Sequence, residues 1–326
     1  NSQGGNYRLL TVNYYDDYAF MGFNGIPAAT DANFKYEVLA GYGTRYTGGY
    51  KGLLTGTMNA QMNPSGVTTS FLYSVMYYDD RGRMIQAKSN NHLAGGIEKE
   101  YVGYNFTGQP LKRRLVHSAT GKTTQTQLYE YVYDHAGRLT QVKHGLNTST
   151  AATVIALNTY DDLGRLKTQK KGSLPATTFG YNVRSWTKSI SNASLFTQTL
   201  YYNEVYGGST KRYNGNVSAM SWKAGSETLR GYAFGYDGLS RLTAATYLLN
   251  GAVNSNNTVS GITYDKHGNM RTIQRRGKTT ASAYGVIDNL TMTYSGNQLT
   301  NVTDAGTTVT LAESNDFKKG STTTPG

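Results

Sequence analysis

The 326-residue sequence contains no cysteine, so neither disulfides nor cysteine-ligated metals hold the chain together. This absence is compatible with an exported protein but does not establish export. Proline is scarce at 5 residues, and no run approaches the roughly 18 apolar residues of a membrane-spanning helix. Residues 1–20 lack the basic start and apolar core of a signal peptide. Helical periodicity is nearly missing: the best candidates, residues 91–101 and 182–190, are short and poorly capped, so we expect little helix.

Tyrosine and glycine are abundant instead. The chain has 28 tyrosines against 9 phenylalanines and 2 tryptophans, together with 38 glycines. Tyrosine combines an apolar ring with a polar tip, which suits a sheet whose faces are only half buried. A mean hydropathy of −0.51 agrees with such wet faces.

A ten-residue pattern, best represented by YDHAGRLTQV from Tyr133, recurs along the chain. Close copies begin at Tyr78, Tyr160, Tyr236 and Tyr264, and weaker copies begin at Tyr104, Tyr181 and Tyr294. Three of the intervals between successive copies are 29, 27 and 28 residues. A period of this length is typical of repeat arrays, in which no unit buries its apolar face alone.

The chemistry of one copy predicts a β-hairpin. An apolar residue usually stands two positions before the tyrosine, which places both side chains on one face of a strand. The Asp134 carboxylate can bond the backbone two positions on, and Gly137 supplies a positive φ at the end of the turn. A second strand then follows. Its apolar residues Leu139 and Val142 are three apart, so a β-bulge or a strong twist is needed to bring them to one face.

The Y-D-x-x-G-R-L unit resembles the YD repeat of RHS proteins, a family that includes bacterial RHS polymorphic toxins, insecticidal toxin-complex cocoon proteins and animal teneurins. The resemblance covers about residues 70–305. It implies an all-β fold in which tandem YD-repeat hairpins form a continuous spiralling sheet, part of a hollow RHS shell. In bacterial members such a shell encloses a toxic C-terminal polypeptide.

We interpret the repeat residues as structural. They are Tyr78, Asp79, Gly82, Arg83, Tyr133, Asp134, Gly137, Arg138, Leu139, Tyr160, Asp161, Gly164, Arg165, Leu166, Tyr236, Asp237, Arg241, Leu242, Tyr264, Asp265 and Gly268.

The pattern divides the chain into three parts. Residues 1–60 are Gly/Tyr-rich, divergent N-terminal repeats, with an early variant of the motif at Tyr14–Tyr18. Residues 61–310 are the YD-repeat array. Residues 311–326 form a polar C-terminal tail or a truncated next repeat. We expect the chain to be an internal segment of a larger protein.

No catalytic, cofactor-binding or metal-binding residue is predicted. The five histidines form no zinc-ligand pair, and His135 and His267 occupy variable turn positions, where solvated side chains are expected. The Asp79–Asp80 and Asp161–Asp162 pairs lack calcium-loop spacing, and the first Asp of each is the repeated turn former. Phosphate-binding and G-x-S-x-G motifs are missing, as is the self-cleaving D-P-x-G segment of RHS cores. We therefore do not expect an enzyme.

The net charge of +12 comes from 32 basic and 20 acidic residues. The basic residues are spread along the array: Lys112–Arg114, Lys170–Lys171, Arg271, Arg275–Arg276 and Lys318–Lys319. This spread favours solvated strand faces over a nucleic-acid groove, which would gather charge on one side. A basic inner wall that holds an acidic or unfolded cargo is a further interpretation, and it predicts that salt weakens cargo retention.

The sequence therefore predicts a structural, non-catalytic YD-repeat segment of a large secreted or cell-surface bacterial RHS protein. This segment would form part of a shell that encapsulates a toxin or effector cargo. The expected partners are other segments of the same protein and an enclosed polypeptide; no membrane insertion is expected. The alternative is a carbohydrate- or cell-surface-binding adhesion array, although no residue singles out a glycan pocket.

Overall fold

The computed structural model describes residues 9–148, 150–151, 153–192, 194–307, 309, 311 and 316–318. These residues contain 21 strands and no helix, so the all-β prediction is confirmed for the described chain. The two helix candidates are turns and strands: β5 (Ile97–Tyr104) and β12 (Thr187–Asn192) occupy them. Within the described chain, no helix is long and apolar enough to cross a membrane.

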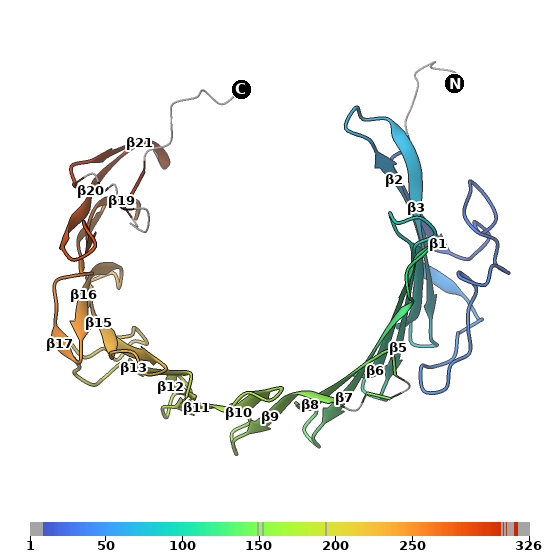
Figure 1. The fold of residues 1–326 in the computed structure, drawn as a ribbon, viewed down its shortest axis with the longest axis horizontal. Coiled ribbons are helices and arrows are strands. Elements are labelled where there is room, and N and C mark those ends of the chain that lie inside the picture. The colour runs from blue at the N-terminus through green and yellow to red at the C-terminus, as the bar shows by residue number, and fades with distance from the viewer. Residues whose placement is uncertain are drawn as a thin grey trace. The chain divides into compact units, whose positions relative to one another are not determined.

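The chain, coloured by residue number in Figure 1, divides into two compact units. The first comprises the residues up to Thr159 with Lys170–Leu174, and the second comprises Tyr160–Gln169 with the residues from Pro175 onward. The spiralling course and hollow shell implied by the resemblance stay predictions. The division into residues 1–60, 61–310 and 311–326 also stays a prediction. In its last part, residues 312–315 and 319–326 lie outside the described residues.

In the first unit, each strand pairs antiparallel with the strand that precedes it in sequence. Besides β5, its strands are β1 (Thr11–Asp16), β2 (Tyr50–Met62), β3 (Thr68–Tyr78), β4 (Met84–Asn90), β6 (Pro110–Ser118), β7 (Gln125–Tyr133), β8 (Leu139–Leu146) and β9 (Thr153–Tyr160).

The second unit is likewise an antiparallel meander, with the short β17 and then β18 both pairing with β16. Besides β12, the strands from the unit boundary onward are β10 (Leu166–Lys171), β11 (Thr177–Tyr181), β13 (Phe196–Tyr201), β14 (Ala219–Ala224), β15 (Arg230–Tyr236), β16 (Leu242–Leu249), β17 (Ala252–Val253), β18 (Val259–Tyr264), β19 (Met270–Lys278), β20 (Tyr284–Ser295) and β21 (Gln298–Asp304).

The predicted hairpins are confirmed at every close copy of the motif. In each, the repeat tyrosine is the last residue of one strand, and the residue six positions later is the first of the next: Tyr78 and Met84, Tyr133 and Leu139, Tyr160 and Leu166, Tyr236 and Leu242, Tyr264 and Met270. The weaker copies at Tyr104 and Tyr181 have the same arrangement.

A β-bulge resolves the odd spacing of the second strand. Tyr133 pairs with Leu139 and Val132 pairs with Gln141, so Thr140 is the extra residue. Tyr131 consequently pairs with Val142. Cross-strand partners share a face, so Leu139 and Val142 both lie on the face of Tyr133. The same register shift occurs beside Tyr78, Tyr104, Tyr181, Tyr236, Tyr264 and Tyr294.

Residues 17–49, which we call the strap, leave the sheet after β1 and return at β2. The early motif variant at Tyr14–Tyr18 forms no tight hairpin, because β1 ends at Asp16 and the next strand begins only at Tyr50. Neither Tyr14 nor Tyr15 has a glycine four positions on. Instead Phe20 becomes buried in the core of the first unit.

This core lies between the strap and one face of β2–β3. The strap contributes Phe20, Met21, Ile26 and Phe34, and the sheet contributes Met58, Val75 and Tyr77. We call the covered side of the first unit the strap face. It carries Val75 and Tyr77, and the register extends it over Gln86, Lys88 and Tyr101.

Candidate functional site

The repeat aspartate organises each turn. Asp134 Oδ1 accepts hydrogen bonds from the backbone N–H groups of Ala136 (3.0 Å) and Arg138 (2.9 Å), and Oδ2 accepts one from Arg138 Nε (2.7 Å). The predicted bond to the backbone two positions on is therefore confirmed. The same contacts recur at Asp79, Asp161 and Asp237, and Asn269 replaces the arginine beside Asp265.

These bonds stabilise the ionised carboxylate. The backbone N–H of Arg138, followed by its guanidinium, holds the pKa of Asp134 below its ordinary range. The backbone N–H of Arg241 has the same effect on the pKa of Asp237. Gly137 has the predicted positive φ, +75°. Ser240 has a φ of 63° in the copy that lacks the glycine, which shows that the turn itself requires this conformation.

Five of the repeat tyrosines donate a hydrogen bond to the preceding repeat. Tyr264 Oη donates to the backbone carbonyl of Leu242 (2.8 Å), and Leu242 stands six residues after the preceding repeat tyrosine, Tyr236. The equivalent bonds, between 2.8 and 3.0 Å, join Tyr104 to Met84, Tyr133 to Pro110, Tyr181 to Leu166 and Tyr294 to Met270. The sequence analysis missed these contacts, although tyrosine rather than phenylalanine at this position was the signal.

Three of the repeat arginines contact the following repeat. The Arg241 guanidinium lies 4.5 Å from the ring centroid of Tyr264, and its Nη1 donates to the Asp265 carbonyl at 3.3 Å. Arg83 and Arg165 make the same pair of contacts with the next repeats, at Tyr104 with Asn105 and at Tyr181 with Asn182. Tyrosine and arginine together therefore connect consecutive hairpins at their turns.

The structure thus brings together the Asp and Arg of one repeat with the Tyr of the next. It does not gather the residues of all copies at one place, because each copy forms its own hairpin turn. The turn carboxylates are engaged by their own turns. His135 and His267 are exposed, as predicted. Among the described residues, no group of three or more His, Asp or Glu side chains is placed to hold a metal ion.

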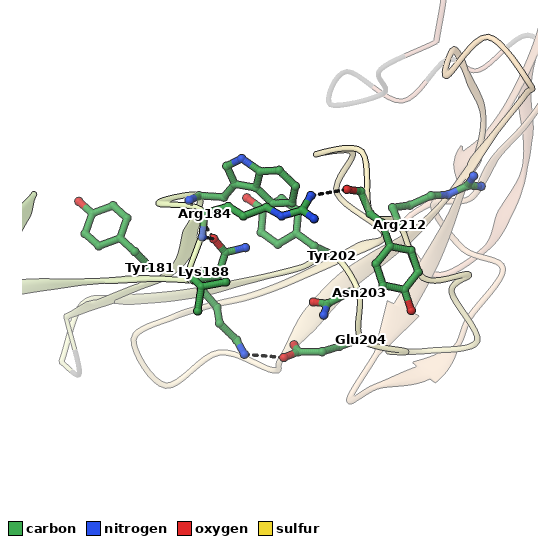
Figure 2. A pocket seen from close by; sticks show the side chains of 11 residues that line it. Tyr181, Arg184, Lys188, Tyr202, Asn203, Glu204 and Arg212 are labelled. Carbon is green, nitrogen blue, oxygen red and sulfur yellow. Dashed lines mark hydrogen bonds and ion pairs between the residues drawn. The ribbon is translucent and has the colours of Figure 1, made fainter. Parts of the chain in front are cut away.

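A pocket of about 460 Å³ in the second unit was not predicted (Figure 2). Trp186 occupies the arginine position of the Tyr181 copy, and its ring lies 5.0 Å from that of Tyr202. The Arg184 guanidinium lies 5.2 Å from the centroid of the Trp186 ring and donates a hydrogen bond to the Tyr213 carbonyl at 2.6 Å. The pocket is bordered below by the ion pair of Lys188 with Glu204, at 2.5 Å.

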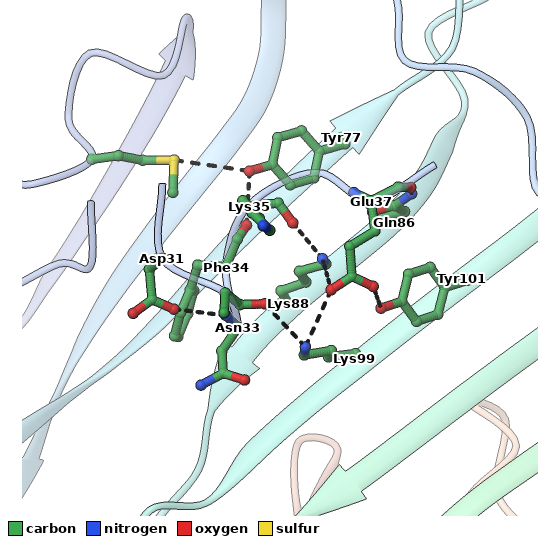
Figure 3. Close-up of polar contacts among 12 residues, drawn as sticks. Asp31, Asn33, Phe34, Lys35, Glu37, Tyr77, Gln86, Lys88, Lys99 and Tyr101 are labelled. Atoms are coloured by element: carbon green, nitrogen blue, oxygen red, sulfur yellow. Dashed lines mark hydrogen bonds and ion pairs between the residues drawn. The ribbon is translucent and has the colours of Figure 1, made fainter. Parts of the chain in front are cut away.

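A polar cluster fastens the strap to its face (Figure 3). Glu37 of the strap accepts a hydrogen bond from Tyr101 Oη (2.6 Å) and pairs with the ammonium groups of Lys88 and Lys99, each at 3.3 Å. The Lys88 side chain is fully buried and also donates to the Lys35 carbonyl. Burial lowers the pKa of Lys88 to about 8. Burial and the bond to Glu37 raise the pKa of Tyr101.

Comparison with known proteins adds three solved structures. No protein-family model matches the sequence, and no curated protein is similar to it. The Photorhabdus luminescens Tc holotoxin pore with a substituted TccC3 shares 10% identity over 74% of this chain and 14% of its own, with a TM-score of 0.29. The TcdB2–TccC3–Cdc42 and TcdB2–TccC3–TEV structures each share 11% identity at the same TM-score, over 75% and 74% of this chain.

This chain spans only 14 to 15% of the length of those chains. What the strands and turns themselves define is a class: an all-β array of tandem antiparallel hairpins whose turns are linked, repeat to repeat, by tyrosine and arginine.

Proposed function

We propose that this chain is a non-catalytic YD-repeat segment of a large bacterial RHS-type protein, secreted or displayed on the cell surface. In this proposal it forms part of a shell that encloses a toxin or effector polypeptide. Its partners are the neighbouring segments of the same protein and the enclosed cargo.

The observation that carries the proposal is the contact between consecutive repeats. The Tyr264 hydroxyl bonds the Leu242 carbonyl, while the Arg241 guanidinium covers the Tyr264 ring. Both contacts lie at the turn, beyond the strand ladder, so they add attachments that an isolated hairpin lacks. An array with such attachments resists opening between hairpins, which is the mechanical property that a wall requires.

The chemistry of the turns supports a structural role over a catalytic one. A general base needs a carboxylate free to accept a proton near neutral pH. The Asp134 and Asp237 carboxylates instead accept several hydrogen bonds from their own turns, and these bonds keep their pKa values low. The aspartates of this motif therefore serve as turn formers in the proposed function.

The natural full-length protein provides the test. Limited proteolysis with mass spectrometry follows the digestion of the enclosed polypeptide over time, before and after the wall is weakened by combining Tyr104→Phe, Tyr264→Phe and Tyr294→Phe. We expect the cargo to survive in the wild-type protein and to be digested faster in the variant. Equal, rapid digestion of the cargo in both proteins contradicts the proposal. Faster release at high salt would support a basic wall around an acidic cargo.

The Trp186 pocket favours a second candidate function, carbohydrate or cell-surface binding. An aromatic wall beside Asn203 and Glu204 offers both ring stacking and polar groups for hydroxyls. A glycan array probed with the wild-type chain and with Trp186→Ala tests this candidate. Hits that the substitution abolishes support adhesion; an array without hits removes it.

A further inference from the structure

The strap shows how this sheet binds irregular polypeptide. Residues 17–49 form no strand, yet they lie on the strap face, where side chains of the sheet donate hydrogen bonds to strap carbonyls. These bonds are Tyr77 to Phe34 (2.8 Å), Gln86 to Glu37 (2.5 Å), Lys99 to Ala32 (3.3 Å) and Lys88 to Lys35. The strap face thus recognises a non-regular backbone by means of its own side-chain donors.

Beside the strap, the same face opens into a groove of about 560 Å³ in the first unit. Strap residues 39, 40 and 42 line one side, and Asn147 and Thr148 of the β8–β9 connection line another. The sheet supplies Arg114 and Leu128. In the strand register, Arg114 stands opposite Tyr101 of β5 and opposite Leu128 of β7. All three side chains therefore lie on the strap face.

The Arg114 guanidinium lies 5.9 Å from the ring centroid of Tyr101, but its charge has no carboxylate partner among the described residues. Among the described residues, its buried Nε has no hydrogen-bond partner, and no acidic group lies within ion-pair distance of its guanidinium. Its neighbours differ: Arg113 pairs with Glu100 at 2.6 Å and Lys112 with Glu130 at 3.9 Å. A buried guanidinium donor without an acceptor costs free energy, and a bound carboxylate satisfies it with charge-assisted hydrogen bonds.

The residues around Arg114 restrict the kind of ligand that can place a carboxylate on its guanidinium. Leu39 and Leu128 give the groove an apolar part, and Thr124 and Thr126 supply hydroxyls beside it. Tyr42 of the strap also lines the groove, and its ring lies 6.1 Å from that of Tyr101. An extended chain with an acidic side chain between apolar residues complements all three features.

We propose that this groove binds an acidic segment of an extended polypeptide, with its side-chain carboxylate on Arg114 and its apolar neighbours on Leu39 and Leu128. The binding event stands by itself; only the identification of this segment with the enclosed cargo rests on the proposed function.

The test uses the 326-residue chain and two fluorescently labelled, capped peptides. These are Ala-Leu-Glu-Leu-Ala and Ala-Leu-Gln-Leu-Ala. Fluorescence anisotropy measures their binding to the wild type, to Arg114→Met and to Arg271→Met. Arg271→Met is the matched control, because Arg271 is an exposed arginine outside the groove. We expect the Glu peptide to bind the wild type about tenfold more tightly than the Gln peptide. Arg114→Met should abolish this preference, and Arg271→Met should retain it.

Equal affinity of both peptides for the wild type overturns the proposal without any need for a variant, so a misfolded Arg114→Met protein does not obscure the result. A preference that survives in Arg114→Met also overturns it. Sodium acetate provides a further arm, with sodium chloride at equal ionic strength as its control. Acetate should displace the Glu peptide where chloride at equal ionic strength does not, and equal displacement by the two salts would overturn the proposal. Cargo protection in the full-length protein is measured separately, so the two proposals fail independently.

Discussion

Tyr264 and Leu242 are joined across two repeats by a hydrogen bond of 2.8 Å from the phenolic hydroxyl to the backbone carbonyl. Leu242 is the first residue of β16, and Tyr264 is the last residue of β18. The bond therefore links the start of one repeat's second strand to the end of the next repeat's first strand. Its recurrence at Tyr104, Tyr133, Tyr181 and Tyr294 makes it a property of the array.

Removing one such hydroxyl should weaken the array measurably. Tyr264→Phe keeps the ring beneath Arg241 but leaves the Leu242 carbonyl without this donor. We expect the free energy of unfolding to fall by about 1 kcal/mol in a denaturant titration. The control is Tyr213→Phe, on a ring that is 61% exposed, for which a change within about 0.5 kcal/mol is expected. Equal effects of the two substitutions would argue against the hydroxyl bond.

The turn glycine should be irreplaceable by a β-branched residue. Gly137 has a φ of +75°, and a Cβ there would lie 3.2 Å from Gln109 Nε2. Gly137→Val should lower the free energy of unfolding by more than about 1 kcal/mol. Gly238→Val serves as the control, because that glycine faces open space without a positive φ. An unchanged denaturation midpoint for Gly137→Val would refute the conformational argument.

Acid should destabilise the turns. The pKa of Asp134 and of Asp237 is lower in the folded chain than the ordinary value of 3.8. Their contribution is therefore complete at neutral pH and is lost as the pH falls below about 4 through the folded-state pKa values. Urea midpoints at pH 7 and pH 3 should differ less in the Asp134→Asn/Asp237→Asn double variant than in the wild type. An identical pH dependence in both proteins would contradict this assignment.

Lys88 gives a pH dependence of the opposite sense. Burial lowers its pKa from 10.5 to about 8, with Glu37 opposing this shift and Lys99 and Lys35 adding to it. Between about pH 8 and pH 10 the unfolded chain binds more protons at this site, so the free energy of unfolding should rise with pH. Lys88→Met should remove that rise. Urea titrations of both proteins at about pH 7.5 and about pH 9.5, the first below and the second above the folded-state pKa of about 8, check the prediction. Parallel rises would exclude Lys88 as the cause.

Local features were predictable from the sequence. The aspartate, glycine and strand-end tyrosine of each repeat specify a hairpin through bonds within five residues, which is why the turns at Asp134 and Gly137 were predicted and found. The odd spacing of Leu139 and Val142 likewise indicated a bulge, and the register shows it at Thr140. The variant at Tyr14–Tyr18 has no tight turn, and Phe20, which follows it, is buried in the core of the first unit.

The sequence by itself determined that this protein is a series of hairpins, because the determinants of each turn are adjacent in the chain. Only the tertiary structure decided what each hairpin touches: the Tyr264 hydroxyl finds its acceptor 22 residues away, and Lys88 finds the strap 53 residues away. The surroundings of Arg114 depend on tertiary structure in the same way, because the strap and β7, which lie beside it, come from other parts of the chain. Such partners depend on register and packing, which no local pattern of residues encodes.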